Sequence, residues 1–436
     1  MERLMALAKE QTDQIELYAL DQTSNHVEFE AGKLIDIQST IESGVTMRLI
    51  KDGKLGFAYT RNLNDRESLV RNARDSLKGG VEVRFDFPAP MKMSMVHDHD
   101  DRIKEASNTV ITDECRRIYG WLQDKVKGQV DVNASTGTSR LRIMNSAGID
   151  VTQDSSYYGI TVNILYPGTA AGIHRTLTFK KFEPVDEEFL ESILRLYGSG
   201  EKEVTTRAGA MQALFMPETM YTFIWRLQSA TSGESLCNRQ SPLADSLGEA
   251  IIDEKLTITN DPLDETIPGA RAFDDEGVAC RRINIVEKGS LMSFYYDLYY
   301  AARMNTEPSG HGFKTSRWGG DPVTMKPAPA LTHVTIEPGN TGFWNLVRRM
   351  DRGVIVCGVL GAHSGNIPNG DFSVGICPGL YVEKGEIIGR IKNAMIAGNI
   401  YSVMKRVIDI EDRTHAAYTG YYPAVLFDSM NVATES

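Results

Sequence analysis

The sequence predicts an α+β protein in which an N-terminal antiparallel sheet carries helices and a C-terminal β-rich domain forms a barrel or a sandwich. Three observations support this fold class. The chain has 436 residues, more than a single hydrophobic core usually serves. An Asp52-Gly53 pair between two β-rich segments indicates a hairpin. Beyond residue 211, short apolar segments separated by glycine turns are typical of sandwiches and barrels.

The first 80 residues alternate between helical and strand patterns. Apolar residues recur at helical spacing over 5–12 and 65–78, and β-type segments occupy 14–20, 24–40 and 43–60. We expect these strands to pair in one antiparallel sheet with the helices beside it. Residues 86–101 then combine two prolines with an acidic tail, which predicts a linker.

The remainder of the chain continues the α+β pattern. A helix is expected over 106–127, β-type segments over 130–180, and a polar helix over 186–198. We therefore predict three regions, which are an N-terminal α+β domain (1–95), a central α+β segment (96–205) and a C-terminal β-rich domain (206–436).

Composition limits the function classes. The formal net charge is −11 without any basic block, which argues against nucleic-acid binding because such binding depends on Lys and Arg neutralising phosphates. No apolar run approaches the roughly 20 residues of a membrane helix, and the N-terminus lacks the pattern of a cleaved leader. The five cysteines are widely spaced and form no C-x-x-C pair, which predicts reduced thiols. We expect a cytoplasmic protein.

The segment LGAHSGNIPNGDFSVG (360–375) concentrates reactive residue types. His363 and Ser364 are neighbours, however, and in an extended segment they point to opposite faces, which disfavours a catalytic triad within the loop. The glycines allow positive φ angles or the close approach of a ligand. A binding loop and an ordinary glycine-rich connection both remain open.

Three other clusters have both a functional and a structural interpretation. The first, His97-Asp98-His99-Asp100-Asp101, could bind a divalent ion, but a solvated charge run is favoured. The second is a tyrosine-rich segment, 293–304. If it is helical, it pairs Tyr295 with Tyr299 and Tyr296 with Tyr300, and packing against a sheet is favoured over ligand stacking. The third, Asp274-Asp275-Glu276, could supply general acids or bases, but a charged turn before a strand is favoured.

Several segments, taken in order over about 400 residues, resemble the TldD/PmbA family, also called modulator of DNA gyrase. They are SGVTMRLIKDGKLGFAYT, LGEAIIDEKLTITNDP, FDDEGVACRRINIVEKGSLMSFYYDLYYAARMN, THVTIEPGN, HSGNIPNGDFSVGICPGLYVEKGEI and AMIAGNIYSVM. The resemblance implies the fold of that family. It also implies a cytoplasmic zinc peptidase that acts on unfolded peptides as a pair of unlike subunits.

The resemblance further separates two kinds of subunit. TldD-type chains carry an H-E-x-x-x-H helix that, with a later cysteine, binds the catalytic metal, whereas PmbA-type (TldE) chains lack it and pair with a TldD partner. Residues 214–237, where that helix should fall, contain no histidine. The chain therefore looks like a PmbA-type member, with no catalytic residue, metal ligand or cofactor of its own and with zinc expected in the partner.

The predicted role of the glycine-rich loop follows from this assignment. We expect five residues to line a peptide groove or a subunit contact, namely His363, Ser364, Asn366, Asn369 and Asp371. The expected partners are a TldD-type subunit and an unfolded peptide, with a homodimer when the chain is alone. Two alternatives remain, which are a non-proteolytic interaction protein that modulates DNA gyrase or its inhibitors, and a metal-independent hydrolase.

Overall fold

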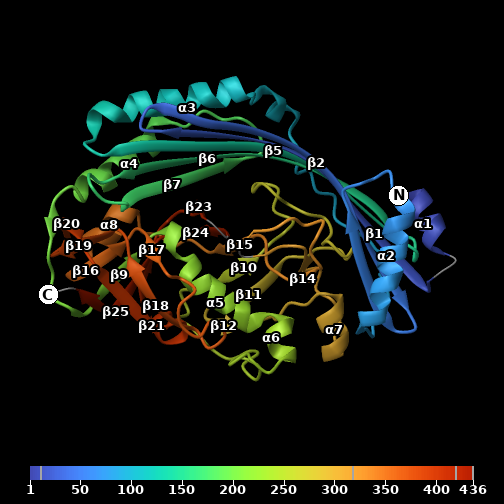
Figure 1. Ribbon diagram of the computed structural model, residues 1–436. Helices are drawn as coiled ribbons and strands as arrows, with labels where there is room; N and C mark the ends of the chain where they lie inside the picture. Colours follow the sequence, from blue (N-terminus) through green and yellow to red (C-terminus); the bar gives the residue numbers. More distant parts are fainter. Residues whose placement is uncertain (10–11, 317–318, 418–419, 435–436) are drawn as a thin grey trace.

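A computed structural model describes residues 1–9, 12–316, 319–417 and 420–434. A long curved sheet from the N-terminal part arches over a β-rich C-terminal part (Figure 1). Helix α3 covers the outer face of the arch, while α1 and α2 lie at the opposite end of the sheet from α4. The predicted α+β class is confirmed, with an antiparallel N-terminal sheet and a strongly curled C-terminal one.

The arching sheet, called sheet A here, is antiparallel throughout. Its seven strands follow the order β4 (Val81–Glu82), β3 (Lys54–Thr60), β2 (Lys33–Lys51), β1 (Gln14–Glu30), β5 (Gln129–Asn145), β6 (Asp150–Leu165) and β7 (Gly172–Phe179). Since β1 pairs with β5 along most of its length, regions 1–95 and 96–205 share one sheet. The boundary at residue 95 stays a prediction.

The predicted hairpin at Asp52-Gly53 joins β2 to β3. Both residues have positive φ, 50° and 70°, as a tight hairpin turn requires. The helices of this part are α1 (Glu2–Lys9), α2 (Arg66–Ser76), α3 (Asn108–Leu122) and α4 (Glu187–Ser199), with short 3-10 turns at Leu77–Gly79, Asp101–Glu105 and Gln123–Lys125. Side chains cap three of them, because Asp65, Ser107 and Asp186 each accept a backbone N–H of the first turn.

The C-terminal part contains a ten-strand sheet and a six-strand sheet. The larger follows the order β17 (Val359–Leu360), β18 (Asp371–Ile376), β21 (Ala394–Asn399), β25 (Val425–Thr434), β9 (Gly209–Phe215), β16 (Arg352–Val356), β19 (Gly379–Glu383), β20 (Glu386–Ile391) and β8 (Glu203–Val204), with β22 (Val407–Ile410) pairing to β25. The smaller follows the order β12 (Ser290–Leu291), β11 (Ile283–Glu287), β10 (Ile258–Asn260), β15 (Val334–Ile336), β24 (Gly420–Tyr422) and β23 (His415–Ala417).

Short elements connect these sheets. A two-strand ribbon pairs β13 (Gly312–Phe313) with β14 (Ala328–Pro329). The helices are α5 (Tyr221–Thr231), α6 (Gly233–Cys237), α7 (Leu298–Met304), α8 (Phe343–Arg348) and α9 (Ile400–Val403), with a 3-10 turn at Pro217–Thr219 before α5. Helix α5 is buried along most of its length, which explains its apolar sequence.

Two large hydrophobic cores hold the molecule together. One fills the C-terminal part around α5, and the other joins sheet A, α3 and α4 to strands of the ten-strand sheet. Helix α4 contacts both β7 and β20, so it lies where the two parts meet. Among the described residues, no helix is both long and apolar enough to cross a membrane.

Two sequence-based helix predictions differ from the structure. The first helix covers Glu2–Lys9 rather than 5–12, and residues 10–11 lie outside the described part. The tyrosine-rich segment becomes helical only at Leu298, because Asp297 caps α7 by accepting the Tyr300 N–H at 2.8 Å. Tyr295 and Tyr296 therefore precede the helix, and the helical tyrosine pairs do not form.

Candidate functional site

The glycine-rich loop connects β17 to β18 at one end of the ten-strand sheet. Three of its glycines have positive φ, namely Gly361 (72°), Gly365 (99°) and Gly370 (86°). A Cβ on Gly365 would lie 2.4 Å from the carbonyl oxygen of Asp371. The loop thus folds back closely on the start of β18, in a conformation that glycine permits and other residues resist.

The five predicted site residues all lie on this loop or at its end. His363, Asn366, Asn369 and Asp371 are exposed, and Ser364 is half-buried. The loop also has internal order, because the Asn366 carbonyl accepts the Asp371 N–H at 3.1 Å. The five residues lie together because they are close in the sequence, and their role in binding stays a prediction.

Asn399, at the end of β21, adds a sixth polar residue that the sequence did not indicate. Its Nδ2 donates to the carbonyl of Asn369 at 2.8 Å and to Oδ1 of Asp371 at 2.9 Å. These bonds fix the Asp371 carboxylate at the base of the loop. No local pattern could have predicted this contact, since the two residues are 28 positions apart.

Arg226 of α5 anchors the loop from inside the molecule. Its side chain is 0% exposed, and it donates three hydrogen bonds to the loop. The acceptors are the carbonyls of Asp371 at 2.7 Å, Ala362 at 3.0 Å and Ser364 at 2.7 Å. A fourth bond joins its Nη1 to the carbonyl of Thr222 at 2.8 Å. Burial lowers the pKa of Arg226 to about 10, so the guanidinium is charged at neutral pH.

The side chains around α5 do not fit a zinc site. Segment 214–237 offers no imidazole, and a buried guanidinium occupies the space between α5 and the loop. A second cation beside Arg226 would be repelled, and tetrahedral zinc needs neutral imidazoles, thiolates or carboxylates. Across residues 1–9, 12–316, 319–417 and 420–434, no group of three or more His, Cys, Asp and Glu could hold a metal ion.

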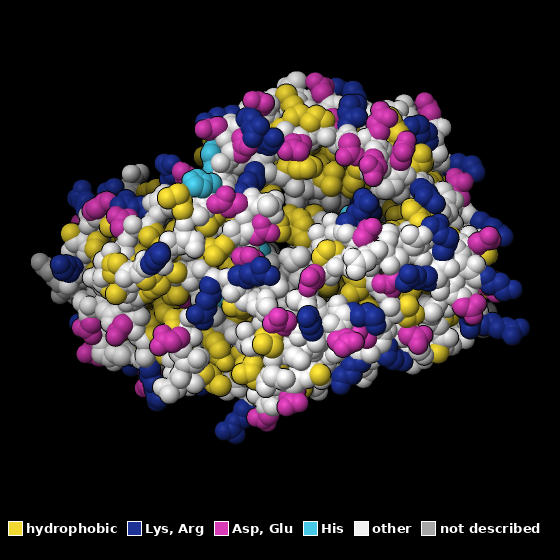
Figure 2. Space-filling view, turned by 180° about the vertical axis from the view of Figure 1, so that it is seen from behind, with side chains coloured by type: hydrophobic (Ala, Val, Ile, Leu, Met, Phe, Trp, Pro, Cys, Tyr) yellow, Lys and Arg dark blue, Asp and Glu magenta, His cyan; other side chains and the backbone are white. Residues whose placement is uncertain are grey.

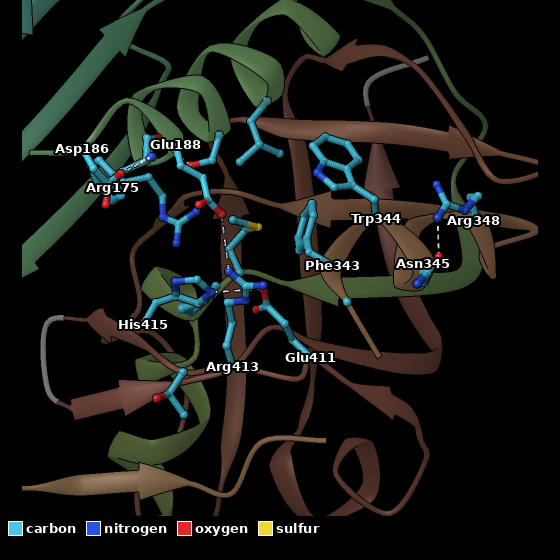
Figure 3. Close-up of a pocket in the computed structure, with 17 residues that line it drawn as sticks. Arg175, Asp186, Glu188, Phe343, Trp344, Asn345, Arg348, Glu411, Arg413 and His415 are labelled. Atoms are coloured by element: carbon cyan, nitrogen blue, oxygen red, sulfur yellow. Dashed lines mark hydrogen bonds and ion pairs between the residues drawn. The ribbon is translucent and has the colours of Figure 1, made fainter. Parts of the chain in front are cut away.

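A cavity of about 570 Å³ lies at the seam between sheet A and the C-terminal part. Its lining combines aromatic and charged side chains from β7, α4, α8 and the segment before β23 (Figure 3). Figure 3 labels Arg175, Asp186, Glu188, Phe343, Trp344, Asn345, Arg348, Glu411, Arg413 and His415. The sequence did not indicate this cavity, because its lining comes from distant segments.

An imidazole and a buried carboxylate meet in this cavity. His415 Nε2 lies 3.1 Å from Oε1 of Glu411, and the other oxygen of Glu411 accepts the Ala424 N–H at 2.9 Å. Such a pair could move a proton as a general base. The hydroxyl of Ser192, which also lines the cavity, already donates to the Phe189 carbonyl at 2.7 Å. The pair can therefore bind a polar group, but Ser192 is not activated by it.

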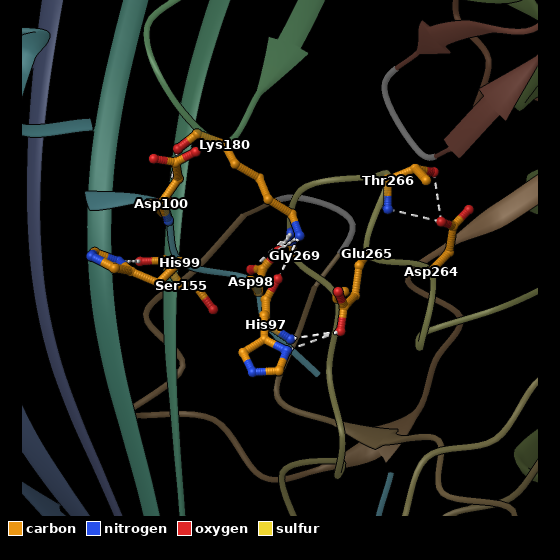
Figure 4. A network of polar contacts seen from close by, with 12 residues as sticks. His97, Asp98, His99, Asp100, Ser155, Lys180, Asp264, Glu265, Thr266 and Gly269 are labelled. Atoms are coloured by element: carbon orange, nitrogen blue, oxygen red, sulfur yellow. Dashed lines mark hydrogen bonds and ion pairs between the residues drawn. The ribbon is translucent and has the colours of Figure 1, made fainter. Parts of the chain in front are cut away.

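The acidic segment 97–101 is only in part the solvated charge run that we favoured, because His97 and Asp101 are exposed but Asp98 is buried (Figure 4). Asp98 is only 1% exposed, accepts the Gly269 N–H at 2.9 Å and lies 3.5 Å from Lys180 Nζ. Burial raises its pKa. His97 pairs with Glu265, whereas His99 approaches the Ser155 carbonyl. His99 thus contacts sheet A, to which Ser155 belongs, whereas His97 contacts the C-terminal part through Glu265. Segment 97–101 therefore joins the two parts.

The acidic cluster Asp274-Asp275-Glu276 forms a turn before a strand, as we favoured, but this turn is buried. Its three side chains are 0%, 4% and 1% exposed. Glu276 pairs with Arg48 of β2 at 2.8 Å, and Asp275 with Arg271 at 2.8 Å. Since each carboxylate is satisfied by an arginine or by backbone N–H groups, the cluster is structural.

Comparison with known proteins agrees with this fold. Residues 208–434 match the model of the PmbA/TldA metallopeptidase C-terminal domain, and residues 15–78 match that of the PmbA/TldA metallopeptidase domain 1. A metalloprotease of Methanothermobacter thermautotrophicus is 25% identical over 395 residues, which cover 86% of this chain and 83% of the relative.

Two solved structures are similar in fold. TldE from Thermococcus kodakarensis has a TM-score of 0.91 at 23% identity, and a proposed modulator of a DNA gyrase from Thermotoga maritima has 0.86 at 23%. Each comparison covers 99% of both chains. Because the C-terminal family model alone spans more than half of the sequence, the chain belongs to the PmbA/TldD metallopeptidase family.

Proposed function

We propose that this chain is the metal-free subunit of a TldD/PmbA-type zinc metallopeptidase, and that it contributes peptide binding and assembly to a pair whose metal is held by a TldD-type partner. The pair acts in the cytoplasm on unfolded peptides, in proteolysis or maturation. Free thiols at all five cysteines are compatible with a reducing compartment.

The observation that carries the proposal is the position of Arg226. The side chain that α5 directs at the glycine-rich loop is a cation bonded to three loop carbonyls. A metal-binding helix would instead present imidazoles there. Arg226 therefore holds the loop in one conformation, and a loop of fixed conformation suits a binding surface.

Peptide binding is supported by the edge position of the loop. β17 lies at the end of the ten-strand sheet, and Leu360 in it is 62% exposed. An edge strand can pair with an extended peptide through backbone hydrogen bonds, which give affinity without strong sequence preference. The exposed side chains of His363 and Asp371 would flank such a peptide.

Kinetics of the reconstituted pair test this role. With His363→Ala or Asp371→Asn in this chain, we expect KM for an unfolded peptide to rise about tenfold, since one polar contact contributes roughly 1.4 kcal/mol. His97→Ala, which changes an exposed histidine far from the loop in the sequence, should leave KM unchanged. Unaltered KM and kcat in both loop variants would contradict the proposal.

Two rival functions give different outcomes. A non-proteolytic modulator of DNA gyrase would recover gyrase, and no H-E-x-x-x-H chain, from a cell lysate. A metal-independent hydrolase, for which the Glu411–His415 pair offers a general base, would cleave peptides as an isolated chain in chelator. Recovery of an H-E-x-x-x-H chain that restores chelator-sensitive hydrolysis supports the proposal.

A further inference from the structure

The cavity at the seam between sheet A and the C-terminal part has a buried floor and an exposed rim. The side chains of Arg175 and Glu411 line the floor and are 7% and 5% exposed. Arg413 and Glu188, at the rim, are 63% and 88% exposed. At about 570 Å³ the cavity has the size of a small-molecule pocket. No residue of the glycine-rich loop, which the structure describes in full, lines it.

An aromatic wall forms one side of the cavity (Figure 3). Phe343 and Trp344 pack edge to face, with ring centroids 5.2 Å apart and an interplanar angle of 90°. The guanidinium of Arg195 lies over Trp344, 3.6 Å from the ring centroid, and fixes the position of the indole. Both rings are half-buried and line the cavity, so they can pack against an aromatic group of a ligand.

The acidic side chains on the other side of the cavity already have partners. Asp186 caps α4, and both oxygens of Glu411 accept hydrogen bonds, one from His415 and one from a backbone N–H. Glu188 lies at the rim, 3.9 Å from Arg413. None of these three carboxylates therefore needs a cationic ligand as its counter-ion.

Arg175, in contrast, has unused hydrogen-bond donors. Its side chain points from β7 into the cavity toward His415 (Figure 3). Arg175 Nε lies 2.5 Å from Oε1 of Glu218, but the two atoms are not aligned for a hydrogen bond. Among the described residues, no other acceptor pairs with this guanidinium, which carries five N–H groups. The buried guanidinium can therefore donate to an anionic oxygen in the cavity.

We propose that this cavity binds a small aromatic carboxylate, with its carboxylate group on Arg175 and its ring against Phe343 and Trp344. The planar guanidinium matches the two oxygens of a carboxylate. The lining contains three arginines and three acidic residues, so its charges balance apart from His415. It accommodates one further negative charge, whereas the second charge of a phosphate group would be repelled by the nearby acidic side chains.

Two sources share this ligand chemistry, namely a free aromatic acid and the C-terminal residue of a peptide that ends in an aromatic side chain. Every residue in the argument belongs to this chain. The proposal therefore goes beyond the peptidase role, and it can be tested on the full chain without a partner.

Titration calorimetry with defined probes is the first test. N-acetylphenylalanine should bind, and its carboxamide should bind at least about tenfold more weakly, because it cannot form the charge-assisted bond with Arg175. N-acetylglycine should also lose at least about tenfold in affinity, since it buries no ring. The tripeptide Gly-Gly-Phe separates the two sources. Binding tighter than that of N-acetylphenylalanine supports a peptide end, and weaker binding supports a free acid.

Two substitutions in the cavity are the second test. Arg175→Lys keeps a positive charge beside Glu218 but loses the planar guanidinium, and Trp344→Leu removes half of the aromatic wall. Each should weaken binding of N-acetylphenylalanine at least about tenfold. A thermal melt checks that each variant is folded, and Trp344→Leu alone decides if Arg175→Lys does not fold.

Matched controls lie outside the cavity. Arg390→Lys changes another buried arginine, which pairs with Glu203 at 3.5 Å. Trp121→Leu removes another half-buried tryptophan that carries a cation, Lys125, 3.0 Å from its ring centroid. Both controls should bind N-acetylphenylalanine like the wild type.

Four results would overturn the proposal. They are no binding of N-acetylphenylalanine at millimolar concentrations, equal affinity for the acid and its carboxamide, tighter binding of inorganic phosphate, and cavity variants that bind as tightly as their controls. All of these measurements use the isolated chain and a cavity outside the glycine-rich loop. Their failure is therefore distinguishable from failure of the proposed peptidase role, which is measured on the pair.

Discussion

Arg226 is the residue on which the candidate site depends most. It lies in the buried helix α5, and its guanidinium donates to the carbonyls of three loop residues. Leaving buried carbonyls without partners costs more than an average hydrogen bond contributes. The loop conformation is therefore coupled to this one side chain.

Replacing Arg226 by methionine should loosen the loop. Methionine fills similar volume but donates no hydrogen bond, so we expect the free energy of unfolding to fall by about 2 to 4 kcal/mol. Backbone amides of Ser364, Gly370 and Asp371 should exchange faster with solvent. Urea denaturation and hydrogen exchange measure the two effects.

Arg406→Met is the matched control. Arg406 is exposed and donates to the Ser402 carbonyl at 3.3 Å, so its loss should change stability by less than about 0.5 kcal/mol. Equal effects of the two substitutions, or unchanged exchange of the loop amides in Arg226→Met, would contradict the anchoring role.

Asp297 links a helix cap to the buried acidic cluster. Burial raises its pKa to about 8, and the nearby Glu276 carboxylate adds to that shift. An unfolded aspartate has a pKa near 3.9. Between about pH 4 and pH 8 the folded state therefore binds a proton that the unfolded state has lost, and stability falls as pH rises.

Asp297→Asn should reduce this pH dependence. Asparagine keeps the cap acceptor for Tyr300 but carries no ionisable proton. From pH 5 to pH 8 the wild type should lose stability more steeply than the variant, by up to about 1.4 kcal/mol per pH unit. Urea denaturation across this range measures both slopes, and parallel slopes would refute the role of Asp297.

At the scale of elements, an aromatic cluster supports α5 behind the loop. Phe223 is fully buried, and its ring centroid lies 4.6 Å from Phe215, 5.1 Å from Phe427 and 5.4 Å from Phe372. These rings come from β9, β25 and β18. The cluster fixes α5 against the strand that follows the loop.

Phe223→Ala should destabilise the chain by about 3 to 5 kcal/mol, because it leaves a cavity among well-packed rings. Met395→Ala, at a 48% exposed position on β21, should cost less than about 0.5 kcal/mol. Chemical denaturation of both variants compares them. A loss below about 1 kcal/mol in Phe223→Ala would mean that the cluster repacks without cost.

Elements with strong local signals could be predicted from the sequence. The Asp52-Gly53 hairpin and the helix around 187–199 have their own turn or capping residues and appear as expected. The start of α7 was missed because the tyrosine spacing suggested a helix that already includes Tyr295 and Tyr296. Asp297 instead caps the helix, which begins at Leu298. The buried charges of Asp98 and Glu276 were misinterpreted because their partners, Lys180 and Arg48, are remote in sequence.

The site itself was only partly predictable. Its loop is one continuous segment and could be found, but its anchors Arg226 and Asn399 are distant in sequence. One signal was present, since Arg226 is the single charged residue in the apolar segment YTFIWRLQSAT, and a buried charge needs partners. The sequence alone could not identify those partners.

At the scale of the whole molecule, buried ion pairs join sheet A to the C-terminal part. Arg48 of β2 binds Glu16 of β1 at 2.7 Å and Glu276 at 2.8 Å, and all three are nearly inaccessible. Burial opposes the charge of Arg48, but the two carboxylates outweigh it and raise its pKa. The two parts are therefore held in one relative position by charge pairing as well as by the shared core.

The outer surface is consistent with protein partners. Lys and Arg are interspersed with Asp and Glu over the face in Figure 2, without a continuous basic patch there. The net charge of −11 agrees with this distribution. Contacts with another subunit and with peptides suit such a surface better than contacts with nucleic-acid phosphates do.

Metal content and peptide hydrolysis, measured on the chain alone and after mixing with a TldD-type partner, test the central claim most directly. We expect no stoichiometric zinc and no hydrolysis for the isolated chain, and zinc-dependent hydrolysis for the mixture that exceeds that of the partner alone. Stoichiometric zinc bound to the isolated chain, or chelator-sensitive hydrolysis by it, would contradict the account.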